Sequence, residues 1–143
     1  MLKKTGFLLI ESLMGIFLLS IITVSCLPLI TSHLYNIRLN KKKAEMVYVL
    51  ESSMEKIINY NLEFPNDEYI MDVPVGEIID IFINKDSATI NLPLMDKDNW
   101  DYLLNIYKEN INDRLWRVQM EISHKGEKRI KNVTLQSIIP IKD

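Results

Sequence analysis

Hydrophobic residues form one nearly unbroken stretch close to the start of the chain, from Phe7 to about Tyr35. Within it, nineteen consecutive residues from Ser12 to Ile30 carry no charge, close to the roughly 20 that a helix needs to cross about 30 Å of hydrocarbon. The pattern therefore predicts a membrane-spanning helix over residues 7–35, in which Glu11 is the only acid. A carboxylate near a bilayer centre costs about 2.5–3.5 kcal/mol on insertion scales, so Glu11 is a candidate functional residue that needs a partner.

Beyond this stretch the pattern becomes amphipathic. We expect one apolar stripe formed by Ala44, Val47, Met54 and Ile58, which recur at spacings of three, seven and four, with Leu50 and Ile57 beside them. Charged residues occupy the other faces of this helix. No glycine interrupts residues 36–62, so we expect one continuous helix that ends near Tyr60 and bends at Pro28. Proline inside a helix normally costs about 3 kcal/mol, but spanning helices tolerate it where neighbours satisfy the freed carbonyl. Residues 61–67, with Pro65-Asn66-Asp67, have the composition of a turn.

The middle of the chain consists of short runs that favour strands. We expect strands at residues 68–73 and 77–84, separated by Pro74-Val75-Gly76. Lys85-Asp86 then predicts a hairpin corner before Ala88-Thr89-Ile90. Residues 96–112 have an ambiguous pattern. One helix face would carry Trp100, Leu103, Leu104 and Tyr107, but Asn105 and Asn110 interrupt the run.

The last hairpin has the clearest pattern. From Trp116 to Ser123 apolar and polar residues alternate strictly, which is the period of a half-buried strand. Lys125-Gly126-Glu127 predicts the turn, and Val133, Leu135 and Ile139 resume the alternation. We therefore expect an α+β fold, in which a long N-terminal helix packs its second half on a small antiparallel sheet, with Trp116 in the interior.

Composition limits the chain to a simple organisation. Its 143 residues have room for one spanning helix and one small soluble domain. The formal net charge of −2 gives no sign of a nucleic-acid-binding balance. The single cysteine excludes an intramolecular disulfide.

No pattern of catalytic residues is present. The chain lacks the phosphate-binding loop, the zinc-protease motif and the serine-hydrolase motif. His33, His124 and Cys26 fall in different parts of the predicted fold, so we expect no shared metal, no cofactor and no enzymatic activity. The pattern predicts a solvated loop at Asp96, Asp98 and Asp101, because Lys97 lies among these acids.

A basic cluster of Arg38, Lys41, Lys42 and Lys43 follows the apolar stretch. At that distance from the span these cations favour contact with lipid head groups over nucleic acid. They face Lys3 and Lys4 across the span, so the positive-inside rule does not decide the orientation.

The start of the chain, Lys3-Lys4-Thr5-Gly6 running into Phe7, resembles the leader and N-terminus of type IV pilins and pseudopilins. The resemblance implies that a prepilin peptidase cuts between Gly6 and Phe7 and that Phe7 is then N-methylated. Glu11 becomes the fifth mature residue, where the family keeps a Glu, and Pro28 becomes the twenty-second, where many pilins have a helix-bending Pro. Leu8 departs from the Thr that is common there. The resemblance covers about thirty residues.

The implied organisation has three parts: a leader at 1–6, a transmembrane and assembly helix at 7–35, and an extracytoplasmic domain at 36–143. The N-terminus would be cytoplasmic and the domain outside, as a single-pass protein of the cell membrane or of a surface filament. The implied function is that of a minor pilin or pseudopilin, in a pilus or in a machine for secretion or DNA uptake. Its partners would be other pilin subunits, the prepilin peptidase, the inner-membrane assembly platform and membrane lipid.

Three alternatives start from the same residues. A cleaved secretory signal is disfavoured by Glu11 and by the lack of an A-x-A-like site. A lipoprotein signal would need Cys26 to be followed by polar residues, but Leu27-Pro28-Leu29-Ile30 continues the apolar run. An uncleaved signal anchor would leave an extracytoplasmic interaction domain that enters no filament.

Overall fold

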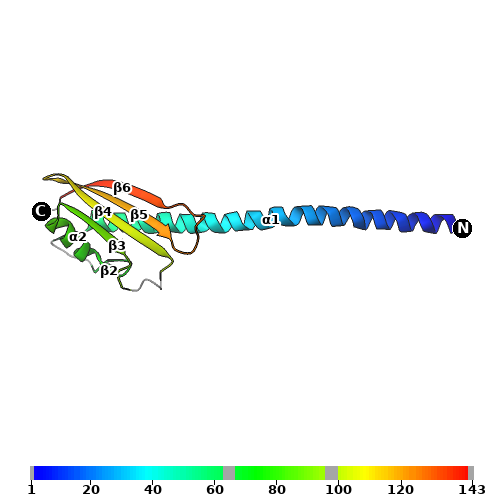
Figure 1. Ribbon diagram of the computed structural model, residues 1–143, viewed down its shortest axis with the longest axis horizontal. Coiled ribbons are helices and arrows are strands. Elements are labelled where there is room, and N and C mark those ends of the chain that lie inside the picture. The colour runs from blue at the N-terminus through cyan, green and yellow to red at the C-terminus, as the bar shows by residue number, and fades with distance from the viewer. Residues whose placement is uncertain (1, 63–66, 96–99, 142–143) are drawn as a thin grey trace. The chain divides into compact units, whose positions relative to one another are not determined.

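The computed structural model describes residues 2–62, 67–95 and 100–141. Along the chain the elements are α1 (Leu2–Asn59), β1 (Tyr69–Ile70), β2 (Val73–Pro74), α2 (Val75–Asn84), β3 (Ser87–Leu92), β4 (Tyr102–Asn112), β5 (Leu115–His124) and β6 (Val133–Pro140) (Figure 1). The chain divides into two compact units, Met1–Lys41 and Lys42–Asp143, with the boundary inside α1. The long helix and the antiparallel sheets confirm the predicted α+β class.

The first unit is the apolar part of α1. Every side chain from Phe7 to Leu34 is exposed, and the helix is long and apolar enough to cross a membrane by length and composition. It continues through Pro28 to Asn59, which confirms the predicted single helix and its end near Tyr60.

The second unit begins with the amphipathic part of α1. Its buried face carries Met46, Leu50, Ser53, Met54 and Ile57, at the spacing of one helical stripe. The predicted stripe was therefore wrong at three of its four residues, since Ala44 and Ile58 are exposed and Val47 is half-buried. Met54 is buried as predicted, and Leu50 and Ile57, predicted beside the stripe, belong to its centre. Counting at 100° per residue places these three beside the face centred on Leu50 and Ile57.

A four-stranded antiparallel sheet in the order β3-β4-β5-β6 packs on this part of α1 (Figure 1). One row of paired residues crosses all four strands, in the order Ile90, Ile106, Met120 and Leu135. Trp116 is 2 % exposed and every second residue of β5 is buried. The predicted strand at 116–123, its return strand and the interior position of Trp116 are confirmed.

The predicted strand at 77–84 is wrong, because these residues belong to α2. Its buried side chains are Val75, Ile78, Ile79 and Phe82, spaced as on one face of a helix. Lys85-Asp86 consequently joins a helix to β3 and is not a hairpin corner.

The segment at 68–73 forms only part of a small hairpin. Ile70 pairs with Val73, and Met71 in the turn has a φ of 55°. Of residues 96–112, Tyr102–Asn112 form strand β4, so a helix there is excluded. The turn residues Pro65 and Asn66 and the acids Asp96 and Asp98 lie outside the described residues. The β5–β6 connection spans residues 125–132, which is longer than the predicted three-residue turn.

Candidate functional site

The predicted processing and assembly residues all lie in the first unit, on α1. Phe7 is 72 % exposed, and Glu11 is exposed four residues further along. Residues four apart lie on the same face of a helix, so Phe7 and Glu11 share one face. Gly6 belongs to α1 by its backbone.

Hydroxyl side chains of this unit are satisfied within the helix. Ser20, Thr23 and Ser25 each donate to the carbonyl four residues earlier, at 2.8 Å. Ser12 does the same at 2.9 Å. Such bonds remove the cost of placing a hydroxyl in hydrocarbon, so these polar residues are compatible with a spanning segment.

Pro28 carries no N–H for the carbonyl four residues before it. Just after it, the Thr31 hydroxyl donates to the carbonyls of Leu27, at 3.1 Å, and Pro28, at 3.0 Å. The helix continues through Pro28 without interruption.

In the second unit, Lys42 lies against the end of β5. Its Nζ is 3.1 Å from Nε2 of His124. The other ring nitrogen, Nδ1, accepts from the backbone N–H groups of Gly126, at 3.0 Å, and Glu127, at 3.2 Å. A neutral imidazole has one N–H, so these two bonds place its hydrogen on Nε2, which faces Lys42.

Tyr102 closes the other side of this cluster. Its ring meets that of His124 edge-on, with centroids 5.3 Å apart, and its hydroxyl donates to Glu45 Oε2 at 2.9 Å. Burial, followed by the hydrogen bond and the charge of Glu45, raises the pKa of Tyr102 to about 12. The hydroxyl therefore remains a donor at neutral pH.

Lys108 is a buried cation on the inner face of β4, with 3 % of its surface exposed. Its Nζ donates to the carbonyls of Phe82, at 2.7 Å, and Lys85, and lies 5.1 Å from the centroid of the Trp116 ring. Burial lowers the pKa of Lys108, and the charge of Asp86 partly opposes that shift. Because the carbonyls belong to the end of α2, the ammonium caps that helix.

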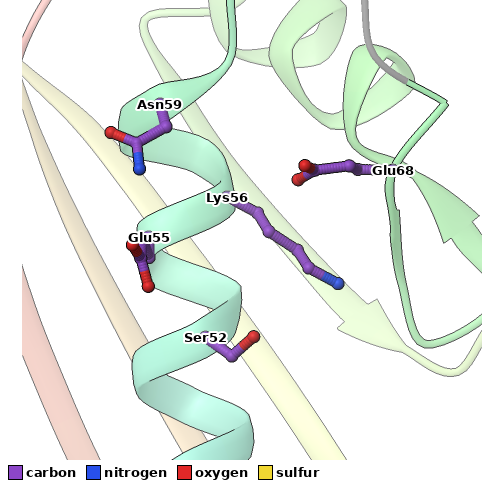
Figure 2. A pocket seen from close by; sticks show the side chains of 5 residues that line it. All are labelled: Ser52, Glu55, Lys56, Asn59 and Glu68. Carbon is purple, nitrogen blue, oxygen red and sulfur yellow. The ribbon is translucent and has the colours of Figure 1, made fainter.

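A polar pocket of about 220 Å³ lies between α1 and the segment before β1. Figure 2 shows Ser52, Glu55, Lys56 and Asn59 on α1, with Glu68 projecting toward them from the opposite side. Lys56 Nζ donates to the carbonyl of Tyr69 at 2.8 Å. That bond attaches the β1–β2 hairpin to α1.

Metal-ligating groups are dispersed in the part of the chain that the structure describes. No three His, Cys, Asp or Glu side chains there come together as a metal site. Cys26 and His33 are exposed on the first unit, and Asp101 is an exposed residue whose carbonyl accepts from Lys125 N.

The comparisons with family models, curated proteins and solved structures find no match for this chain.

Two arrangements were missed by sequence analysis. The Lys42–His124 contact joins residues 82 apart, so no local pattern announces it. Lys108 stands where the alternation of β4 requires an inward side chain, after Leu104 and Ile106. For a strand over residues 102–112, that alternation predicts an inward Lys108.

Proposed function

We propose that this chain is a minor pilin or pseudopilin, a structural subunit of a type IV pilus or of a related pseudopilus. The observation that carries the proposal is the placement of Gly6, Phe7, Glu11 and Pro28, in the register of the pilin family, on one helix. That helix exposes every side chain from Phe7 to Leu34 and then enters a small α+β domain.

The exposed apolar surface supports an assembly role. A soluble protein rarely leaves so many large apolar side chains uncovered. Lipid would cover them before assembly, and the equivalent helices of neighbouring subunits would cover them in a filament. One helix can serve in both environments because its hydroxyls are already bonded to its own backbone.

Glu11 would supply the specificity of assembly. After cleavage the new amine of Phe7 is largely cationic at neutral pH, since such amines have pKa values of about 7.7–8.0. Glu11 would pair with the terminal amine of an adjacent subunit and thereby set the axial register. Docking replaces the cost of an unpaired carboxylate in lipid with an ion pair at low dielectric.

The second candidate is a signal-anchored extracytoplasmic domain without filament partners. The apolar helix near the N-terminus is compatible with a simple anchor as well. The two candidates differ at the N-terminus, because a signal anchor keeps residues 1–6.

Processing at Gly6 is the decisive test. We expect mature protein from cells with a prepilin peptidase to begin at N-methylated Phe7, and Gly6→Val to leave the full-length chain in the membrane, because the peptidase site accepts a small residue. N-terminal sequencing and intact mass measure both outcomes. Gly15→Val is the matched control, since a Cβ at Gly15 meets no atom within 4 Å. A mature wild-type protein that still begins at Met1 or Leu2 would contradict the proposal.

A further inference from the structure

The charges of the second unit are distributed unevenly. Residues 42–143 contain 13 Lys and Arg and 18 Asp and Glu, a formal charge of −5. Yet the β5–β6 connection carries Lys125, Lys128, Arg129 and Lys131 with Glu127 as its only acid, and Lys42 contacts its first residues through His124. We call these five cations the basic surface. Without it and Glu127 the unit would have a formal charge of −9 (8 Lys and Arg, 17 Asp and Glu).

The basic surface is held in a defined conformation. Ile130 is buried beneath it, its N–H donates to the Glu127 carbonyl at 3.2 Å, and Lys125 N donates to the Asp101 carbonyl at 2.9 Å. Lys128 and Lys131, on either side of the buried residue, are exposed. The loss of conformational entropy when these cations bind a ligand is therefore smaller than it would be for a flexible basic tail.

Two carboxylates of the second unit, Glu45 and Glu121, have hydrogen-bond donors of their own. Tyr102 donates to Glu45 at 2.9 Å, and the Asn132 side chain donates to Glu121 at 2.7 Å. Neither of these two hydrogen bonds uses Lys42 or a cation of the β5–β6 connection.

Lys42 and His124 present two nitrogen donors at the start of the β5–β6 connection. With Nδ1 occupied by two backbone donors, Nε2 carries the imidazole hydrogen and faces the Lys42 ammonium at 3.1 Å. A phosphate oxygen placed beside both nitrogens would accept from the two donors at once.

The sequence places a phosphate-bearing surface within reach. Lys42 follows Ile30, the end of the uncharged segment, by twelve residues, which span at most about 40 Å even when fully extended. Arg38 and Lys41 add two cations to that stretch. Anionic membranes attract juxtamembrane cations by about fivefold in affinity for each Lys or Arg.

We propose that the basic surface, with the Lys42–His124 pair, binds the phosphate head groups of anionic phospholipid in the membrane that carries the chain. The proposal rests on the proposed function, because it requires α1 to be anchored in that membrane. The contact would hold the unassembled subunit against the bilayer, and incorporation into a filament would release it.

Lysine acetylation of the full chain in lipid nanodiscs tests this contact. A neutral acetylating reagent is applied in discs of phosphatidylcholine alone and in discs that also contain phosphatidylglycerol, and each lysine is followed by mass spectrometry. We expect acetylation of Lys42, Lys128 and Lys131 to slow by about fivefold in the anionic discs. Lys85, an exposed cation at the end of α2, is the internal control and should react equally in both.

A double variant, Lys128→Gln with Lys131→Gln, tests whether the cations act together. Both side chains are exposed, so the fold should persist, and we expect protection of Lys42 to fall toward the value in neutral discs. Lys85→Gln should leave the protection unchanged. Retained protection of Lys42 in the double variant would overturn the role of the loop.

Each contrary result identifies what has failed. A chain that does not remain in the discs overturns the anchor and this proposal together. An anchored chain with equal rates in both discs overturns only the lipid contact. Protection by inorganic phosphate in neutral discs, to the same extent, would indicate a soluble anion. Protection by a DNA duplex, without an effect of anionic lipid, would indicate nucleic acid, and either result overturns the lipid proposal.

Discussion

Lys108 illustrates how one residue links three elements of the domain. It lies on β4, donates to carbonyls at the end of α2 and rests on the ring of Trp116 from β5. Phe82 of α2 also meets Trp116 edge-on, with centroids 5.7 Å apart. The aromatic face and the carbonyls replace the water that burial removes from the ammonium.

The lowered pKa of Lys108 predicts a pH dependence of stability. In the pH range between that lowered value and 10.5, the unfolded chain binds more protons than the folded chain. The free energy of unfolding therefore rises with pH in this range and is lowest below it, where both states are protonated. We expect this rise to be absent in Lys108→Met.

The measurement is a comparison of denaturant unfolding of wild type and Lys108→Met, as full chains in detergent, followed by tryptophan fluorescence from pH 8 to pH 10.5. The difference in free energy between them should shift in favour of the wild type as pH rises. Lys85→Met, which removes an exposed cation, should show a constant difference from the wild type. A constant difference for Lys108→Met as well would show that burial does not disfavour the Lys108 charge.

At the scale of elements, α2 shows why residue preference alone misled the sequence prediction. Ile and Val favour strands, and Ile78, Ile79, Ile81 and Ile83 follow one another closely. Their burial, however, follows the helical spacing of Val75, Ile78, Ile79 and Phe82, which was readable from the sequence. For β5 the preference and the period agree, and there the prediction succeeded.

The packing of α2 on the end of α1 depends on Gly76. A Cβ added at Gly76 would lie 2.8 Å from the hydroxyl oxygen of Tyr60, whose ring is almost buried. Glycine to alanine in a helix usually stabilises by about 1 kcal/mol, but here we expect Gly76→Ala to destabilise by about 1–3 kcal/mol through overpacking.

A double-mutant cycle isolates that contact. In a Tyr60→Phe background the hydroxyl is gone and the nearest remaining atom of the ring lies 3.6 Å from the added Cβ, so Gly76→Ala should become neutral or stabilising. Denaturant unfolding of the four proteins gives the coupling energy, which we expect to be about 1 kcal/mol or more. Additive effects would mean that Tyr60 does not limit the size of residue 76.

At the scale of the whole molecule, sequence patterns predicted the elements that depend on neighbouring residues. The length of α1, the α+β class and the β5–β6 pair follow from runs and periods of neighbouring residues. The basic surface depends on strand register and on the position of α1 against the end of β5, which bring residues 82 apart into contact. The basic residues of the β5–β6 connection were visible in the sequence, but their relation to Lys42 was not.

The function of the whole subunit depends on Glu11, whose carboxylate is exposed on a helix where large apolar side chains are exposed as well. Ion pairing with the terminal amine of an adjacent subunit and simple tolerance both account for an acid at this position. In the second case the carboxylate would lean toward head groups at the end of the span, and its identity would hardly matter. The two explanations predict different behaviour of Glu11 variants only when subunits assemble.

We expect Glu11→Ala to leave cleavage after Gly6 and membrane insertion intact, because neither depends on a charge pair between mature subunits. Recovery of the subunit in sheared filaments, or in crosslinks to partner subunits, should fall strongly. Glu11→Gln, which keeps the size and the polarity of the side chain but not its charge, should show the same loss if an ion pair is required. Quantitative immunoblots of sheared and membrane fractions measure the partition. Normal incorporation of both variants would exclude the pairing mechanism while leaving the processing prediction in place.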